Sequence, residues 1–289
     1  MTPPALLLLL LFISLAEGHV VQSFKGTCGQ FFITDPKDQN NHIPPTILTD
    51  NQDPDRYKQI CQRYSSQYRY ATLYDTQNRI PVYSAYQYTG HTKLKRKTTW
   101  MIEPQLDELT ASRSMGSESK VDKSKRGNYQ ALNKDFNSTY HKGHLYPVCH
   151  NDNQPCAYAT FTLTNAAPQT SSDNLDWYHK VEAKVNKELE KICNTAHIVT
   201  GVVPGSKWMK KDNREVNIPS HFWTAYCCTG KPGGPVTRAV LAQTNPLTID
   251  NNVVTVDDLN QKLSSLYGSS VPATGFEGPR QTVTLTILS

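Results

Sequence analysis

One long segment of this chain has the periodicity of an α-helix. In residues 173–193 Lys and Glu alternate with apolar side chains that recur at steps of three and four, namely Tyr178, Val181, Val185, Leu189 and Ile192. The pattern predicts an amphipathic helix whose apolar face packs on a core. Ser172 or Asp173 is available as its N-cap. The rest of that core must come from elements of another kind, because the other apolar segments are short.

Short apolar runs bounded by turn residues predict β-strands in the rest of the chain. The candidates are residues 79–90, 159–164, 197–203, 222–229 and 238–244. A second, shorter helix is predicted over residues 256–266, behind Thr255. No internal repeat or linker marks a domain boundary. We therefore expect an α+β fold, with a mixed β-sheet core and flanking helices, in which residues 19–289 form one domain.

Residues 1–18 have the character of a secretory signal peptide. A run of leucines leads to the small residues Ala16 and Gly18, and its apolar core is too short to span a bilayer comfortably. An uncleaved N-terminal anchor is the alternative. No later stretch approaches about 18 uninterrupted apolar residues, so no other stable membrane span is expected. The sequence thus predicts a secreted, extracellular protein.

Seven cysteines in a chain with a secretory signal favour disulfides over a thiolate metal site, because no Cys-x-x-Cys pair is present. Two of them are adjacent in a predicted strand, where neighbouring side chains point to opposite faces. Only one of these two is therefore expected to pair, and the other to be a buried free thiol. The expected pairs are Cys28 with Cys61, Cys149 with Cys156, and Cys193 with either Cys227 or Cys228.

The formal net charge is +5, and basic residues gather in three segments, 93–97, 120–126 and 207–214. Such clusters favour polyanions, because the association releases counterions. Charge runs are also common on solvated surfaces, so charge alone does not establish nucleic-acid binding.

A histidine that directly follows a glycine, with amides and a carboxylate further along, suits hydrolysis of a phosphodiester. The reaction needs a base for water, a cation that neutralises charge on the phosphorane, and groups that hold both in line. His144 is a candidate base, since imidazole is neutral and accepts protons near physiological pH. Gly143 lets the backbone turn sharply or approach a substrate closely.

Asn174 and Glu182 lie eight residues apart in the predicted helix. In a regular α-helix this spacing gives an offset of about 80° around the axis, so both side chains can border one site. A single amide oxygen plus waters suits Mg²⁺. Each residue also has an ordinary interpretation: Asn174 as a helix cap, Glu182 as a solvated helix residue, and His144 as a histidine bound to backbone.

Taken together, these residues resemble the DNA/RNA non-specific endonuclease family, whose active site is a ββα-metal (His-Me) finger. In that family an Asp-Arg-Gly-His motif ends a strand, an Asn-x-x-Pro-Gln turn follows, and a helix supplies a metal-binding Asn and a nearby Glu. The matching residues here are Gly143, His144, Asn165, Pro168, Gln169, Asn174 and Glu182. The resemblance covers most of the chain.

The resemblance implies a secreted, metal-dependent endonuclease that hydrolyses DNA, with RNA as a further substrate, at low sequence specificity. His144 would be the general base, Asn174 the direct ligand of Mg²⁺ or Mn²⁺, and Glu182 an acid that orients water at the metal. Asn165 and Gln169 would position phosphate or the finger itself.

Two departures from the family pattern concern the rate of the reaction. His141 and Lys142 stand where the family has Asp-Arg, so a carboxylate and the bidentate fork of an arginine are replaced. The family's upstream transition-state arginine aligns near Thr98, with Arg96 close enough to substitute if the strand shifts register. The alternative function is therefore a catalytically weakened nuclease fold that binds polyanions or immune partners.

Asn137-Ser138-Thr139 is an N-glycosylation sequon four residues before His141. An occupied sequon requires a surface loop, which agrees with a motif at the edge of a cleft. A structural, disulfide-rich secreted protein is the third reading, but it leaves the spacing from Gly143 to Glu182 to chance.

Overall fold

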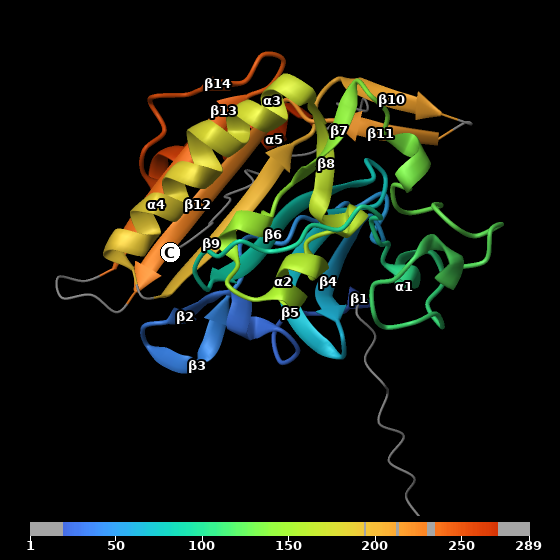
Figure 1. Cartoon of the computed structure of the whole chain (residues 1–289), viewed down its shortest axis with the longest axis horizontal. Helices are drawn as coiled ribbons and strands as arrows, with labels where there is room; N and C mark the ends of the chain where they lie inside the picture. The colour runs from blue at the N-terminus through green and yellow to red at the C-terminus, as the bar shows by residue number, and fades with distance from the viewer. Residues whose placement is uncertain (1–19, 194, 212–213, 230–234, 271–289) are drawn as a thin grey trace, which may run out of the picture.

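A large antiparallel sheet forms the centre of the protein (Figure 1). The computed structural model describes residues 20–193, 195–211, 214–229 and 235–270, so the predicted signal peptide, residues 1–18, lies outside the described residues. The eight-stranded sheet has the order β1 (Val20–Val21), β4 (Tyr57–Tyr64), β5 (Gln67–Asp75), β6 (Ile80–Tyr88), β9 (Thr195–Val203), β12 (His221–Thr229), β13 (Val236–Gln243) and β14 (Thr248–Ile249).

The α+β class is confirmed, but the sheet differs from the mixed one that we expected. Neighbouring strands are antiparallel in every pair of this sheet. The physical reason is that β4, β5 and β6 follow one another through short turns, and tight hairpins can join only antiparallel strands. Four of the five predicted strands correspond to β6, β9, β12 and β13.

Smaller elements surround the sheet. Three separate hairpins are β2 (Ile33–Asp35) with β3 (Asp38–Ile43), β7 (Tyr140–His144) with β8 (Ala166–Thr170), and β10 (Lys207–Lys211) with β11 (Arg214–Ile218). The helices are α1 (Pro104–Asp107), α2 (Gln154–Ala159), α3 (Ser171–Trp177), the π-helical turn η6 (Tyr178–Glu182), α4 (Ala183–Ile192) and α5 (Val256–Ser270). Short 3₁₀ turns are η1 (Gly29–Phe31), η2 (Glu118–Lys120), η3 (Asn133–Asp135), η4 (Val148–His150) and η5 (Leu163–Asn165). In the described part of the chain, no helix is long and apolar enough to cross a membrane.

Helices cover both faces of the sheet. The continuous helix α3–η6–α4 lies across β9 and β12 in Figure 1, and its Val185 and Leu189 belong to one core with Ile198 and Phe222. On the opposite face, Leu259 and Leu263 of α5 share a core with the alternate strand residues Val199 and Trp223. Because successive side chains of a strand point to opposite faces, β9 and β12 supply both cores at once. Both predicted helices are thus confirmed.

The long helix begins earlier than we predicted. Thr170 is its N-cap, since the Thr170 hydroxyl accepts a hydrogen bond from the Asp173 backbone N–H at 3.1 Å. Ser172 and Asp173, our candidates, lie inside the first turn. At α5, Thr255 caps as expected: its hydroxyl accepts from Asp258 N at 3.1 Å, while Asp258 accepts from Thr255 N at 3.0 Å.

The predicted strand at residues 159–164 is wrong. This segment contains the end of α2 and the start of η5. Alternation of Thr with Phe and Leu suggested one wet and one dry face, but Thr160, Thr162 and Thr164 are as buried as their neighbours. Their hydroxyls bond locally or across the core, as in the 2.8 Å bond from Thr160 to the Ala157 carbonyl. The residue pattern therefore does not report a two-sided strand.

Two disulfides, Cys28–Cys61 and Cys193–Cys228, are present, and Cys227 is a buried free thiol, all as predicted. The expected pair of Cys149 with Cys156 is wrong, because both are free thiols held by other partners. The Cys149 thiol lies 3.7 Å from Glu182 Oε2, and Cys156 Sγ accepts from Arg69 Nη1 at 3.7 Å.

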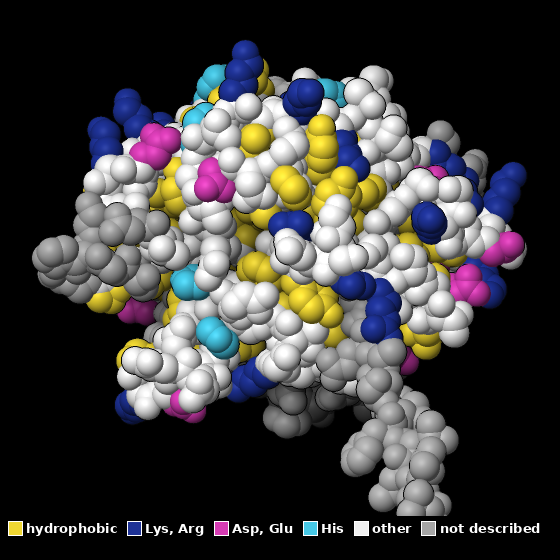
Figure 2. Space-filling model, turned by 60° about the horizontal axis from the view of Figure 1, so that its bottom comes forward, with side chains coloured by type: hydrophobic (Ala, Val, Ile, Leu, Met, Phe, Trp, Pro, Cys, Tyr) yellow, Lys and Arg dark blue, Asp and Glu magenta, His cyan; other side chains and the backbone are white. Residues whose placement is uncertain are grey.

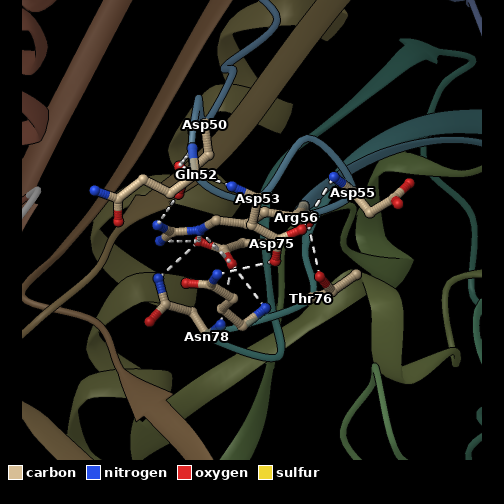
Figure 3. Close-up of polar contacts among 9 residues, drawn as sticks. Asp50, Gln52, Asp53, Asp55, Arg56, Asp75, Thr76 and Asn78 are labelled. Carbon is tan, nitrogen blue, oxygen red and sulfur yellow. Dashed lines mark hydrogen bonds and ion pairs between the residues drawn. The ribbon is translucent and has the colours of Figure 1, made fainter.

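A partly buried charge cluster ties the segment before β4 to the β5–β6 turn (Figure 3). Arg56 Nη2 donates to Asp75 Oδ2 at 2.8 Å, and Arg56 Nη1 to Asp50 Oδ2 at 3.1 Å. Asp75, which is 1% exposed, also accepts from Asn78 Nδ2 at 2.7 Å and from the backbone N–H groups of Gln77 and Asn78 at 3.0 Å. Every charge buried in this cluster therefore has hydrogen-bonded partners.

Replacing Asp75 with Asn should destabilise the protein by about 3 kcal/mol, because it leaves the Arg56 guanidinium buried beside a neutral partner. Chemical denaturation followed by circular dichroism measures the change. Asp176→Asn is the matched control, since it breaks the solvent-exposed Asp176–Lys180 pair and should cost less than about 0.5 kcal/mol. Equal effects of the two substitutions would contradict the role given to Asp75.

Candidate active site

The predicted ββα unit is formed by β7, β8 and α3. β7 and β8 pair in antiparallel register, with Gly143 opposite Ala167 and His144 opposite Ala166. A Cβ atom on Gly143 would lie 2.2 Å from Oε1 of Gln169, so only glycine allows this approach. The Gln169 side chain can therefore pack against Gly143, and the next residue of β7, His144, lies at the site.

His144 is held in an aromatic box. Its ring centroid lies 4.5 Å from that of Trp100 and 5.0 Å from that of Phe161, and only 8% of the residue is exposed. Burial, with a smaller effect of the Arg96 charge, lowers the pKa of His144 to about 3. Its Nε2 atom is buried without a hydrogen-bond partner among the described residues. His144 is therefore neutral near pH 7, with a free nitrogen.

Most of the predicted site residues border one cavity of about 390 Å³. The cavity is lined by His144 and Lys142 from the β7 strand, Arg96 from the preceding loop, and Asn174 and Glu182 from the long helix. Arg96 therefore lines the cavity although it does not align with the family's upstream arginine, whose place is near Thr98. The remaining lining residues are His141, Pro147, Val148, Cys149, Ser171, Leu175 and Tyr178.

The π-helical turn η6 accounts for the common orientation of Asn174 and Glu182. The Ala183 backbone N–H bonds to the Tyr178 carbonyl, five residues back, so the helix is wider here than an α-helix. Each residue of the wide turn rotates by less than the roughly 100° of an α-helix. The offset of about 80° expected for a spacing of eight therefore shrinks, and both side chains face the cavity. Such turns occur frequently at functional sites.

A buried chain of hydrogen bonds holds the backbone carbonyl of Glu182. His150 Nε2 lies 3.0 Å from the Glu182 carbonyl oxygen, which can only accept, so this nitrogen carries the proton. Burial lowers the pKa of His150 to about 4, so the ring is neutral and its Nδ1 accepts from Tyr86 Oη at 3.0 Å. Sequence reasoning missed His150, because no spacing or motif marks it.

The Glu182 carboxyl group is itself desolvated. Burial raises its pKa to about 8, although the bond from the Cys149 thiol and the charge of Arg96 both lower it. In the protein alone, the carboxyl group is therefore largely protonated at neutral pH. His144 and Glu182 are both shifted toward their uncharged forms by the same cavity.

Three buried polar residues lie near the site, and two of them bind the protein's own backbone. Asn165 is fully buried and binds the Tyr146 N–H and carbonyl at 2.9 and 3.0 Å, so it fixes the loop after β7. Gln169 is 2% exposed, and its amide atoms have no partners among the described residues. The carboxylate of Asp173 accepts from the backbone N–H groups of Asn245 and Leu247 at 2.9 and 2.8 Å, so it anchors the start of the helix.

Lys142 and His141, which replace the family's Asp-Arg, occupy different surroundings. Lys142 is half-buried, with Nζ 5.9 Å from the Trp100 ring centroid and 5.2 Å from that of Phe136. Burial lowers the pKa of Lys142, although Glu118 opposes the shift. His141 is exposed. Elsewhere, Lys and Arg side chains are spread over several parts of the face drawn in Figure 2. Positive charge at the cavity therefore comes chiefly from Arg96 and Lys142.

The donor set fits a hard divalent cation that keeps most of its water. Among the described residues, no group of three or more His, Cys, Asp or Glu side chains could hold a metal ion. The Asn174 amide and the Glu182 carboxyl group instead offer oxygen donors in a cavity with room for a hydrated ion. Mg²⁺ is commonly bound by one or two protein oxygens plus waters.

The profile of one family, DNA/RNA non-specific endonuclease, matches residues 53–274, a range that includes the ββα unit and the whole cavity. The chain belongs to this family of nucleases. It is also similar to the endonuclease domain-containing 1 proteins of Homo sapiens, with 33% identity over 259 residues, and of Mus musculus, with 29% over 243 residues. These matches cover 86% and 80% of this chain but 48% and 44% of the relatives, so the chain spans about half the length of these curated relatives.

Among solved structures, the crystal structure of an EndoG/EndoGI complex matches with a TM-score of 0.48 and 19% sequence identity. The match covers 72% of this chain and 84% of the other.

Replacing Glu182 with Gln should stabilise the protein at pH 8 but not at pH 4. Below pH about 4, Glu182 is protonated in both states; as the pH rises, the unfolded chain ionises while the folded protein holds its proton, so the wild type loses stability. We expect a gain of about 1–3 kcal/mol at pH 8, since one pKa unit corresponds to about 1.4 kcal/mol and the side chain keeps some solvent contact.

Denaturation curves at several pH values measure this difference, with Glu190→Gln on the exposed side of the same helix as control. A gain for Glu182→Gln that does not depend on pH would contradict the burial of its carboxyl group.

Proposed function

We propose that the protein is a metal-dependent endonuclease that hydrolyses phosphodiester bonds of DNA, with RNA as a further substrate, at low sequence specificity. One observation carries the proposal: a neutral histidine with a free nitrogen, an amide, a carboxyl group and an arginine line the same cavity. The family of the chain supports a nucleic-acid substrate.

In this proposal Arg96 and Lys142 bind the substrate phosphate, and Arg96 stabilises the negative charge that develops on it. The neutral imidazole of His144 accepts a proton from the attacking water. Its low pKa in the protein alone does not prevent this, because a phosphate anion in the cavity favours the imidazolium ion and offsets the charge of Arg96. Gln169 and Asn165 hold the β7–β8 hairpin in position.

Asn174, together with Glu182, would hold the cation. When bound, Mg²⁺ or Mn²⁺ supplies positive charge next to the leaving oxygen. Beside a bound cation the Glu182 carboxyl group would release its proton to solvent and, as a carboxylate, would orient nearby water. The His150–Glu182 hydrogen bond fixes the backbone from which that carboxylate projects.

A second candidate function is binding of polyanions without hydrolysis. It is favoured by the low basicity of His144 and by Lys142, whose ammonium group contacts aromatic rings and lacks the fork of an arginine. In this case the basic residues bind nucleic acid or another polyanion through counterion release, and the bond is not cleaved.

The proposal includes secretion after removal of residues 1–18, as one domain over residues 19–289. Two disulfides support it, since such bonds persist in oxidising compartments. The sequon residue Asn137 is exposed just before β7, and its Oδ1 accepts from Thr139 N at 2.8 Å in a surface turn. A glycan at Asn137 is compatible with this exposure.

Incubation with supercoiled plasmid and Mg²⁺ should give nicked and linear products. His144→Ala should reduce the rate by about 10²–10⁴-fold, because the general base is lost, and Arg96→Met by about 10²–10³-fold, because the developing charge loses its partner. His221→Ala is the control, since His221 lies on β12 and does not line the cavity. Chelation with EDTA should stop the reaction.

Two results would contradict parts of this proposal. Cleavage that persists in His144→Ala would exclude the assigned base. Salt-dependent plasmid binding without any Mg²⁺-dependent nicking would favour the polyanion-binding candidate.

A further inference from the structure

The cavity is lined by two chemically different kinds of side chain. Arg96 and Lys142 bring positive charge, and Leu175 and Tyr178 of the long helix bring apolar surface. Leu175 is 58% exposed and Tyr178 is 42% exposed, which places them among the few large hydrophobic side chains that the described part of the chain leaves open to solvent. Exposed apolar surface that polar residues surround is typical of ligand-binding sites.

The geometry of the helix places this apolar pair beside the reacting groups. Asn174, Tyr178 and Glu182 follow one another at steps of four, and the π turn that starts at Tyr178 keeps all three on the cavity side. Leu175 is the direct neighbour of the proposed metal ligand Asn174. The ring of His179 lies 4.9 Å from the Tyr178 ring with the planes inclined by 66°, so the two rings are not stacked on each other.

A nucleotide, like the lining of the cavity, has a charged part and a part that packs on apolar groups. Its phosphate is anionic, and its base is a flat surface that stacks on aromatic side chains. In a duplex the bases are paired and stacked inside, so an enzyme that contacts the phosphate backbone cannot reach a base face without flipping the nucleotide. Only an unpaired nucleotide can place its phosphate at Arg96 and its base against Tyr178 and Leu175 in the same cavity.

We propose that Tyr178 and Leu175 form a stacking platform for one unpaired nucleobase next to the cleaved phosphate. The platform makes single-stranded or locally unpaired nucleic acid the preferred substrate class. This inference rests on the proposed nuclease function and specifies its substrate. Loss of one stacked base corresponds to about 5- to 150-fold in affinity for a single strand.

The test compares one single-stranded oligodeoxynucleotide with its duplex, in cleavage with Mg²⁺ and in equilibrium binding by fluorescence anisotropy with Ca²⁺ in place of Mg²⁺. We expect wild-type protein to cleave the single strand faster. Tyr178→Ala should lower kcat/KM and affinity for the single strand by about 5- to 150-fold and change those for the duplex by less than about threefold. Tyr178→Phe should retain the single-strand preference, because the ring is kept.

Tyr129→Ala is the control, since Tyr129 is 51% exposed but does not line the cavity. A single abasic residue beside the main cleavage site should weaken binding and cleavage of the single strand by the wild-type protein, but should cause little further loss in Tyr178→Ala. The proposed platform is wrong if Tyr178→Ala weakens binding of both substrates equally or of neither. The second result is the one expected if Tyr178 and Leu175 bind a protein.

Failure of the nuclease function is a separate outcome. If the wild type cleaves neither substrate, the proposed catalysis is wrong, and anisotropy alone then decides the platform by the same comparison of variants.

Discussion

The site depends on how the long helix is held against the sheet. Its start is fixed by the Thr170 cap and by the two backbone amides bound to Asp173, and its end by the Cys193–Cys228 disulfide. Between these points, the apolar face packs on β9 and β12. With both ends and the buried face fixed, the wide turn η6 sets which way Asn174 and Glu182 point. The hairpin β7–β8 then brings His144 to the same cavity.

Burial has opposite effects on the pKa values of the two titratable groups at the centre of the site. It lowers the pKa of the His144 imidazole and raises that of the Glu182 carboxyl group, so both are uncharged at pH 7 in the protein alone. A cation favours the carboxylate, and an anionic phosphate favours the imidazolium ion. The protein thus provides a cavity whose charge state depends on what it binds. Burying the same two groups in their charged forms would cost more desolvation free energy during folding.

The sequence predicted the architecture correctly where a residue pattern has a single physical cause, such as the packing of one face of a helix. Helix periodicity between 173 and 193 follows from packing of one helix face on the sheet, and the strands β6, β9, β12 and β13 are indicated by short apolar runs bounded by turn residues. The segment 159–164 misled, because its threonines satisfy their hydroxyls inside the core. The grouping of Gly143, His144, Asn174 and Glu182 came from family resemblance, and the structure adds that His144, Asn174 and Glu182 share one cavity with Arg96. The role of His150 could not be predicted, because a buried contact to a backbone carbonyl does not require a recognisable sequence motif. The wide turn could not be predicted, because a shift of backbone hydrogen bonds does not require particular residues.

The Cys193–Cys228 disulfide links the geometry of the site to the place where the chain folds. It joins the last turn of the helix to β12, and such a bond forms in oxidising compartments but not in the reducing cytosol. A copy of the chain that stays in the cytosol lacks this covalent tie, so the helix end is free to fray and Glu182 is held less firmly. If the protein is secreted and cleaves nucleic acids as proposed, the geometry of its site is completed only where this disulfide can form.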